Sequence, residues 1–162
     1  MPISIRQYRE ADNPLVKKLH YDGLNQSGAF IDNPALDADL DNIEKVYLKN
    51  RGEFLVGFEA NRLIAMGALK RVSDTIGEIK RMRVVQDYQR QGIGQRIFDR
   101  LVQCAQELGY TKLVLDTSVL QVAAQKFYEK NGFTEVRRDI LHGLACIFYE
   151  KSLCAGVKSN PL

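Results

Sequence analysis

The feature that most constrains the fold is a central stretch, residues 78–116, in which a strand pattern leads into a helix pattern and then a second strand pattern. Polar and apolar side chains alternate over residues 78–85, which indicates a strand. Residues 92–108 carry apolar side chains near the helical period, Gly109 is a helix stop, and residues 112–116 are a short apolar strand. Two strands that a helix connects within one sheet lie parallel. The stretch therefore predicts a parallel pair.

The strand patterns on either side of this stretch indicate hairpins, which are antiparallel. We expect three further helices, at residues 15–24, 37–48 and 119–130, with Asp37 as the cap of the second. We also expect a short opening strand at residues 3–5 and four further strands, at 53–59, 63–72, 133–138 and 144–150. The fold class predicted is α+β, with a mixed, mostly antiparallel sheet of about seven strands flanked by four helices.

Length and composition fit one globular domain. The chain has 162 residues, of which 45% are hydrophobic and 27% charged, and it can bury a sizeable core. We expect a single domain over residues 1–151 and a loosely ordered tail over residues 152–162. The net charge is only +3, and Lys and Arg alternate with Asp and Glu, which argues against a nucleic-acid partner.

Cysteine and histidine usage points to a cytoplasmic protein without a metal. Cys104, Cys146 and Cys154 are odd in number and lack CxxC spacing, as is typical of reduced thiols. His20 and His142 are the two histidines, and neither lies at ligand spacing from a cysteine. No apolar run has the length of a signal peptide or a transmembrane helix, so no membrane partner is expected.

The loop between the central strand and its helix has the features of an anion site. A strand that leads through a glycine-containing loop into a helix directs backbone N–H groups at a phosphate. Gly92 and Gly94 let the backbone approach an anion, while Gln89, Arg90 and Gln91 add donors and a positive charge. Taken alone, the two glycines are equally consistent with a plain turn at a helix entry.

Two familiar nucleotide-binding motifs do not fit this loop. Gln95 and Arg96 stand where a Walker loop needs Lys followed by Ser or Thr. Ile97 stands where a dinucleotide-binding fingerprint needs a small residue. The loop is therefore not predicted to bind a nucleotide in either of these ways.

Two segments resemble signatures of the GNAT acetyltransferase superfamily. The run VVQDYQRQGIG at residues 84–94 is similar to a strand that leads into Gln/Arg-x-x-Gly-x-Gly/Ala. The run AQKFYEKNGF at residues 124–133 is similar to the family's Ala-x-x-Phe/Leu-Tyr-x-x-x-Gly-Phe segment. The resemblance implies an N-acetyltransferase that moves the acetyl group of acetyl-CoA directly to a primary amine, on a small molecule or a peptide, in a ternary complex.

The resemblance also implies how the cofactor is held. The fourth strand splays from the fifth, and the pantetheine arm enters the gap while the loop wraps the pyrophosphate. The implied cofactor-binding residues are Met82, Val84, Gln89, Arg90, Gln91, Gly92, Ile93, Gly94, Gln95 and Gln121. Three positions depart from the family pattern: Gln86 replaces a common Pro, Arg90 a common Gly, and Gln121 a common Asn that touches the pantetheine arm.

Tyr128 and Glu78 are the catalytic candidates that the resemblance implies. Tyr128 matches the family's general acid, which protonates the departing thiolate, and its alternative role is packing beside Phe127. Glu78 matches the general base, directly or through water, and its alternative is an exposed carboxylate paired with a neighbouring Lys or Arg. The N–H of Met82, at a strand bulge, is the candidate oxyanion donor.

The acceptor pocket is the least constrained part of the site. The resemblance places it near the loop at residues 25–37 with Phe30, and near Tyr47, while His142 is a further candidate base because histidine is the side-chain type that ordinarily exchanges a proton near neutral pH. The alternatives are core packing for Phe30 and a solvated loop position for His142. The acceptor amine stays open, a homodimer is favoured on family grounds, and a non-catalytic CoA-binding sensor or interaction module is the alternative function.

Overall fold

The fold is that of a computed structural model, in which residues 2–27 and 34–153 are described. Phe30, which the sequence analysis assigns to the acceptor pocket, lies outside the described residues, as does the chain beyond Leu153. The last strand continues through Ser152, and the Leu153 side chain is buried.

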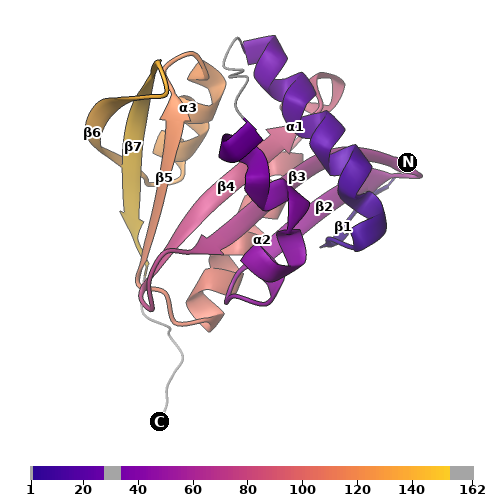
Figure 1. Cartoon of the computed structure of the whole chain (residues 1–162), viewed down its shortest axis with the longest axis horizontal. Coiled ribbons are helices and arrows are strands. Elements are labelled where there is room, and N and C mark those ends of the chain that lie inside the picture. Colours follow the sequence, from indigo (N-terminus) through magenta and orange to yellow (C-terminus); the bar gives the residue numbers. More distant parts are fainter. Residues whose placement is uncertain (1, 28–33, 154–162) are drawn as a thin grey trace.

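Seven strands of the described chain form one mixed sheet, in the order β1-β2-β3-β4-β5-β7-β6 (Figure 1). Within this sheet β4 and β5 are parallel, and the other neighbouring pairs are antiparallel. The strands are β1 (Ile3–Gln7), β2 (Glu53–Glu59), β3 (Arg62–Arg71), β4 (Ile76–Val84), β5 (Lys112–Ser118), β6 (Thr134–Leu141) and β7 (Leu144–Ser152). The predicted fold class and the predicted parallel crossover are confirmed.

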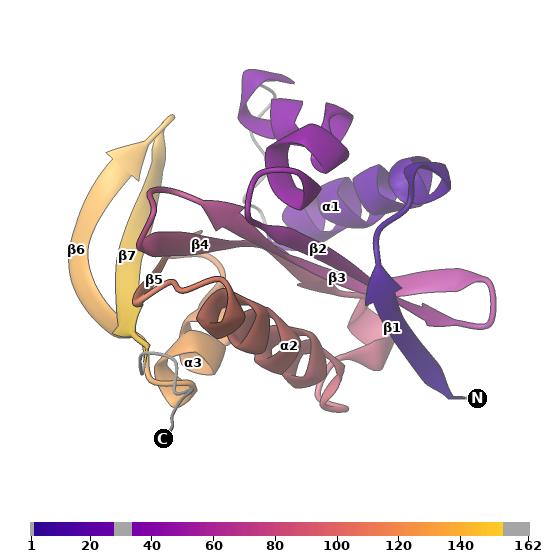
Figure 2. The ribbon, with the colours of Figure 1, turned by 90° about the horizontal axis from the view of Figure 1, so that it is seen from below.

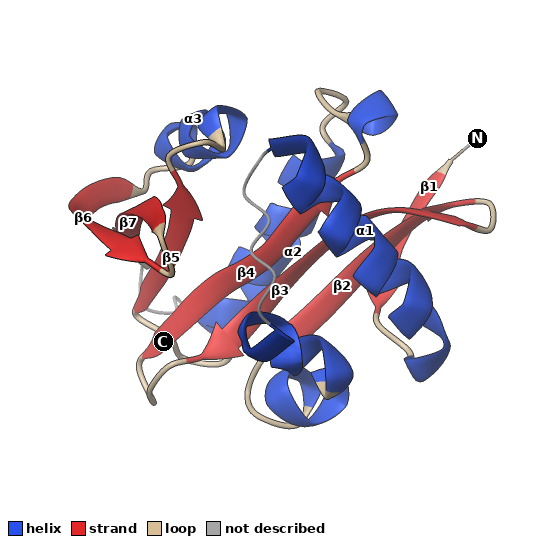
Figure 3. Ribbon diagram, turned by 45° about the horizontal axis from the view of Figure 1, so that its top comes forward, coloured by secondary structure: helices blue, strands red, loops and turns tan. Residues whose placement is uncertain are grey.

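Helices cover both faces of the sheet. The α-helices are α1 (Asn13–Ser27), α2 (Ile93–Glu107) and α3 (Val122–Lys130), and the short helical segments are η1 (Glu10–Asp12), η2 (Pro34–Asp41), η3 (Glu44–Leu48) and η4 (Gln86–Tyr88). Figure 2 shows α1 and the short segments that follow it on one side of the sheet, and α2 and α3 on the other. In Figure 3, α1 crosses the face formed by β2, β3 and β4, and it contacts β3 and β4.

The apolar residues of the central strands divide between two cores. Phe54 and Val56 of β2 pack beneath α1 and η3, whereas Leu55 between them joins the core beneath α2. The helix α2 contributes a stripe at helical spacing, including Ile97 and Leu101, both of which are fully buried. Because both faces are covered, β2 and β3 are apolar almost throughout rather than alternating.

The strands β4 and β5 form a V. They pair at residues 76–78 of β4 and 112–114 of β5, and then separate (Figure 1). From there β5 pairs along its length with β7 instead, while β4 stays with β3. This is the splay that the family resemblance implies, and it leaves one edge of β4 without a neighbouring strand beyond Glu78.

A β-bulge lies in β4 at Arg81 and Met82. Ala68 of β3 pairs with Lys80 and Met66 pairs with Arg83, so Gly67 alone opposes two residues. Arg81 has a positive φ of 60°. A Cβ added to Gly67 would collide with the Met82 Sδ, so the bulge leaves no room for a side chain at Gly67. The bulge expected near Met82 is present, and it breaks the strict alternation predicted over residues 78–85. A one-residue insertion changes the face to which later side chains point.

The second helix expected before the hairpins is interrupted. Residues 37–48 form parts of η2 and η3 rather than one helix, and Asp37 lies inside η2 with non-helical backbone angles. Asp37 is therefore not a helix cap. Its carboxylate instead accepts hydrogen bonds from His20 and Arg81, which lie on α1 and β4. These contacts across the domain outweigh the local helical preference of the segment.

Candidate functional site

The loop before α2 is shaped by two left-handed residues. Arg90 has φ 64°, and Gly92, the N-cap of α2, has φ 81°. A glycine adopts this conformation without strain, whereas Gly94 lies inside the first turn of α2, where an added Cβ would make ordinary contact with Val84. The first N–H groups of a helix have no acceptor within it, so those of α2 remain available at this end.

The glutamines of this loop are used to hold its shape. The Gln89 Nε2 donates to the Val84 carbonyl oxygen at 2.9 Å, and the Gln91 Nε2 donates to the Asp87 carbonyl oxygen at 3.2 Å. The Gln95 side chain exchanges hydrogen bonds with Asn131 at the end of α3, at 2.8 and 3.1 Å. These amides thus fix the loop and join α2 to α3, a role that the sequence analysis did not assign to them.

A cavity of about 560 Å³, here called the loop cavity, joins this loop to the bulged end of β4 and to α3. Its lining brings together eight of the residues predicted as functional: Met82, Val84, Gln89, Arg90, Gly92, Gly94, Gln95 and Tyr128. Gln91 and Ile93 do not line it, and the Ile93 side chain is buried in the core. The predicted pantetheine, phosphate and acid positions therefore share one continuous space.

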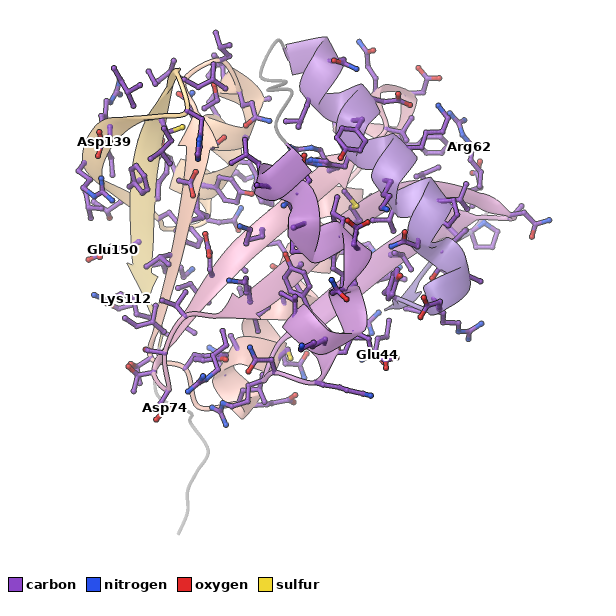
Figure 4. The ribbon with its side chains drawn as sticks, viewed as in Figure 1. Glu44, Arg62, Asp74, Lys112, Asp139 and Glu150 are labelled. Carbon is purple, nitrogen blue, oxygen red and sulfur yellow. The ribbon has the colours of Figure 1, made fainter. Side chains whose placement is uncertain are left out.

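A larger cavity of about 1240 Å³, here called the α1 cavity, lies between α1, the turn between β2 and β3, and the loop before α3. It shares Met82, Arg83 and Val84 with the loop cavity. Arg62, at the β2–β3 turn, lines it and lies on the opposite side of the molecule from Asp139 and Glu150 (Figure 4). The two cavities meet along the unpaired edge of β4, so a donor and an acceptor can approach each other there.

Tyr128 lies on α3 and lines the loop cavity. Its side chain is 7% exposed and packs edge-on against Phe127 and Phe133, with ring centroids 5.4 and 5.7 Å away. Burial raises the pKa of the Tyr128 phenol, and the charge of Arg83 opposes that rise. The phenol therefore stays protonated at neutral pH, as a proton donor must be. The packing role is therefore observed, and the role as a general acid stays a prediction.

Glu78 occupies the last β4 position that pairs with β5, where the V begins. Burial raises the pKa of the Glu78 carboxyl; Lys80 opposes this rise and the charge of Asp116 adds to it. A raised pKa suits a general base. Glu78 is not among the described residues that line either cavity, so the structure does not bring it together with Tyr128.

The other predicted site residues have different surroundings. Gln121 lines the α1 cavity, and its Oε1 accepts a hydrogen bond from Thr117 at 2.9 Å. His142 is exposed in the turn between β6 and β7, away from the lining of both cavities. Tyr47 is fully buried and donates a hydrogen bond to Asp39, so it is a core residue rather than part of a pocket wall.

A buried ionic network lies behind the site. The Arg81 guanidinium contacts Asp39 and lies 3.1 Å from Asp37, and the His20 Nε2 lies 2.9 Å from Asp37. Burial, with the charges of Arg81 and Arg83, lowers the pKa of His20 to about 4, so the ring is neutral at pH 7. The sequence analysis missed this network, because its members come from three separated segments.

Besides the ionic network, the sequence analysis also missed Arg83 as a functional candidate. Its Nη1 donates to the Met82 carbonyl oxygen at 2.9 Å, and its buried Nε has no hydrogen-bond partner. Burial lowers the pKa of the Arg83 guanidinium, which still carries its charge at neutral pH. Strict alternation from Ile79, which is buried beneath α2, would place the Arg83 side chain on that same face, whereas the bulge turns it towards α1, where it approaches Gly23.

Comparison with known proteins identifies the family. A sequence model described as the Acetyltransferase (GNAT) family matches residues 20–133. The chain belongs to the GNAT acetyltransferase family. The resemblance that the two motifs carry is thereby confirmed, and with it the class of acyltransferase that the sequence analysis predicted.

Relatives and solved structures agree with this assignment. The N-acetylaspartate synthetase of Xenopus tropicalis is 31% identical over 104 residues, which are 63% of this GNAT chain but 38% of that protein. A GNAT-family acetyltransferase from Staphylococcus aureus Mu50 has the same fold, with a TM-score of 0.87, 23% identity and coverage of 94% and 100% of the two chains. The Salmonella typhimurium structure yncA, solved with its cofactor acetyl-CoA, has a TM-score of 0.76 at 18% identity over 99% of both chains.

Over residues 2–27 and 34–153, no group of three or more His, Cys, Asp or Glu side chains is arranged to hold a metal ion. In the same part of the chain, no helix combines the length and apolar character needed to cross a membrane.

Proposed function

We propose that this GNAT domain transfers the acetyl group of acetyl-CoA directly to a primary amine. The observation that carries the proposal is the loop cavity, which joins the start of α2, the unpaired edge of β4 and the Tyr128 side chain. Acetyl-CoA supplies a thioester, a long amide-containing arm and a pyrophosphate. Along that cavity, each of these three parts of acetyl-CoA meets residues whose chemistry suits it.

The loop fits a pyrophosphate. Arg90 and Gly92 turn the backbone so that the free N–H groups at the start of α2 border the cavity, and Arg90 adds a positive charge. The GNAT neighbour from Salmonella typhimurium was solved with acetyl-CoA, which supports the same cofactor here. Gln91 and Ile93 would take part through their backbone only, because neither side chain lines the cavity.

The edge of β4 fits the arm of the cofactor. The carbonyl oxygens of Met82 and Val84 accept hydrogen bonds from the side chains of Arg83 and Gln89. Side-chain donors at these two carbonyls indicate that the oxygens are accessible at the open edge of β4. The amides of a pantetheine arm could donate to them there. A carbonyl oxygen has two lone pairs, so a second donor is compatible with the first.

The chain's own groups then account for the proton movements. As the amine nitrogen forms its bond to the acetyl carbon and the carbon–sulfur bond breaks, Tyr128 donates a proton to the sulfur. The amine loses a proton to water, which can pass it to Glu78, and the Met82 N–H donates to the thioester oxygen. A covalent enzyme intermediate is not needed, because the amine attacks the thioester directly. Cys104 lines neither cavity, and burial raises the pKa of its thiol to about 11.

The proposal is tested by measuring thiol release from acetyl-CoA with a panel of primary amines. Release that depends on both the amine and the protein supports the transferase. Tight acetyl-CoA binding without release for any amine would instead indicate a non-catalytic CoA-binding module.

Tyr128→Phe tests the proposed acid. Phenylalanine keeps the ring that packs against Phe127 and Phe133 but removes the hydroxyl. We expect kcat to fall roughly 100-fold, the scale of general acid catalysis, while the Kd for acetyl-CoA changes little. The measurements are steady-state kinetics and calorimetry. A variant with wild-type kcat would show that Tyr128 only packs.

A further inference from the structure

Arg83 is a buried cation at the meeting point of the two cavities. Its guanidinium folds back on the strand, with Nη1 2.9 Å from the Met82 carbonyl oxygen. Its Nε is buried and has no hydrogen-bond partner, and Arg83 is a lining residue of both cavities. A guanidinium has five N–H donors in a planar fork, so most of its hydrogen-bonding capacity is not used by the described residues.

The charge of Arg83 is not compensated by an ion pair. Among the salt bridges of the described residues, Arg81 takes the carboxylates of Asp37 and Asp39, and Arg83 takes none. His20, the nearby imidazole, is neutral at pH 7. Buried charges in proteins are normally paired, because an unpaired one loses its hydration without compensation. An anionic ligand would supply the missing partner.

The space around Arg83 is adapted to its side chain. A Cβ added to Gly23 of α1 would lie 2.8 Å from the Arg83 Cδ. Glycine at this position of the helix therefore gives the guanidinium room between α1 and the sheet. This location is on the α1 side of β4, whereas the phosphate-binding loop and α2 lie on the other side (Figure 2). The ligand that Arg83 faces is thus better matched to the acceptor than to the pyrophosphate.

The charges around the α1 cavity favour a zwitterion over a highly charged anion. Besides Arg83, two cations and three carboxylates line it: Lys18, Arg62, Asp22, Glu59 and Asp87. A lining with balanced charge suits a ligand that carries one ammonium and one carboxylate. The fork of an arginine matches the two oxygens of a carboxylate.

We propose that Arg83 binds the carboxylate of the acceptor, and that the acceptor is a free α-amino acid. The inference rests on the proposed function. Arg83 hydrogen-bonds to the residue whose N–H is the proposed oxyanion donor, so a carboxylate held there lies beside the thioester position. In an α-amino acid the amine and the carboxylate share one carbon. The same contact would therefore bring the amine to the acetyl group.

The experiment compares the common α-amino acids with their amides and their decarboxylated amines in the thiol-release assay. We expect the wild-type protein to prefer an acid over its matched amide and amine. Arg83→Met should raise KM for that acid roughly 10- to 100-fold, the scale of a charged hydrogen bond, with kcat nearly unchanged. Activity with the amide should fall far less than activity with the acid, and Arg83→Lys should retain part of the preference.

Controls separate this inference from the proposed function. Arg100→Met removes an exposed arginine of α2 and should behave as wild type. Calorimetry gives the affinity of each variant for acetyl-CoA and of the CoA complex for each amino acid. The inference is overturned if amides and amines react as well as acids, if no amino acid binds or reacts, or if Arg83→Met weakens acetyl-CoA binding instead. A wild-type protein that does not bind acetyl-CoA would overturn the proposed function itself.

Discussion

Arg81 and Arg83 lie two residues apart on β4 and point to the same face of the sheet, yet their surroundings differ. Arg81 hydrogen-bonds to Asp37, to Asp39 and to the Leu36 carbonyl oxygen. Among residues 2–27 and 34–153, Arg83 has one hydrogen bond, to the backbone of its own strand, and its buried Nε has no partner. The first arginine completes a network that holds η2 on the sheet. The second faces two cavities, where its partner can be a ligand.

The comparison shows how one strand can serve both stability and function. The bulge sends both side chains to the α1 side, and the carboxylates of η2 reach only the first. Paired charges in the interior hold elements together, whereas an unpaired charge lowers stability and is expected where a site needs it. Three substitutions separate these roles.

Arg81→Met should have the largest effect on stability. It would leave the buried carboxylates of Asp37 and Asp39 without the guanidinium that neutralises them, and removing one member of a buried ion pair costs about 3–5 kcal/mol. Urea unfolding followed by circular dichroism measures this loss. A loss below about 1 kcal/mol would mean that the network contributes little.

His20 should make stability depend on pH. Its pKa is about 4 in the folded protein, below its unfolded value of 6.5, so below pH 6.5 the unfolded state binds the proton first. The contribution of neutral His20 to the free energy of unfolding is complete above pH 6.5. It is lost as the pH falls to 4, and the loss reaches up to about 3 kcal/mol. His20→Gln should remove this slope in urea unfolding at several pH values. His142→Gln, at the exposed histidine, should keep it; equal slopes in both variants would contradict the assignment.

Arg83→Met should have the smallest effect on stability. Because it removes a buried charge that has no ion pair, we expect unfolding free energy to change by less than about 1 kcal/mol, or to rise. The same urea measurement as for Arg81→Met provides the comparison. A loss as large as that of Arg81→Met would show that Arg83 has a structural partner.

Much of the fold could be predicted from local patterns, and the site only in part. The helical period of α2 and the strands on each side of it determine the parallel pair, and the loop residues follow from their position between β4 and α2. The roles of Arg81 and Arg83 could not be predicted, because one inserted residue reverses the face to which they point.

The interruption of the predicted helix near Asp37 could not be predicted from the sequence either. Its cause is a contact between η2 and β4, which are far apart in sequence, and local helix propensity does not depend on such a contact. The position of His142, away from the lining of both cavities, could not be predicted for a related reason, since it depends on where the β6–β7 hairpin lies relative to α1.

The most direct test of the proposed function is the affinity for acetyl-CoA, measured by calorimetry in a pair of glycine variants. Gly92 and Gly109 lie at opposite ends of α2 with φ of 81° and 89°, and in both cases an added Cβ would have no atom within 4 Å beyond the adjoining residues. Alanine therefore strains both backbones alike, but only Gly92 lines the loop cavity. We predict that the wild type and Gly109→Ala bind acetyl-CoA equally and that Gly92→Ala binds at least about tenfold more weakly, a difference of about 1.4 kcal/mol. Equal affinities for the two variants, or no binding by the wild type, would contradict the account.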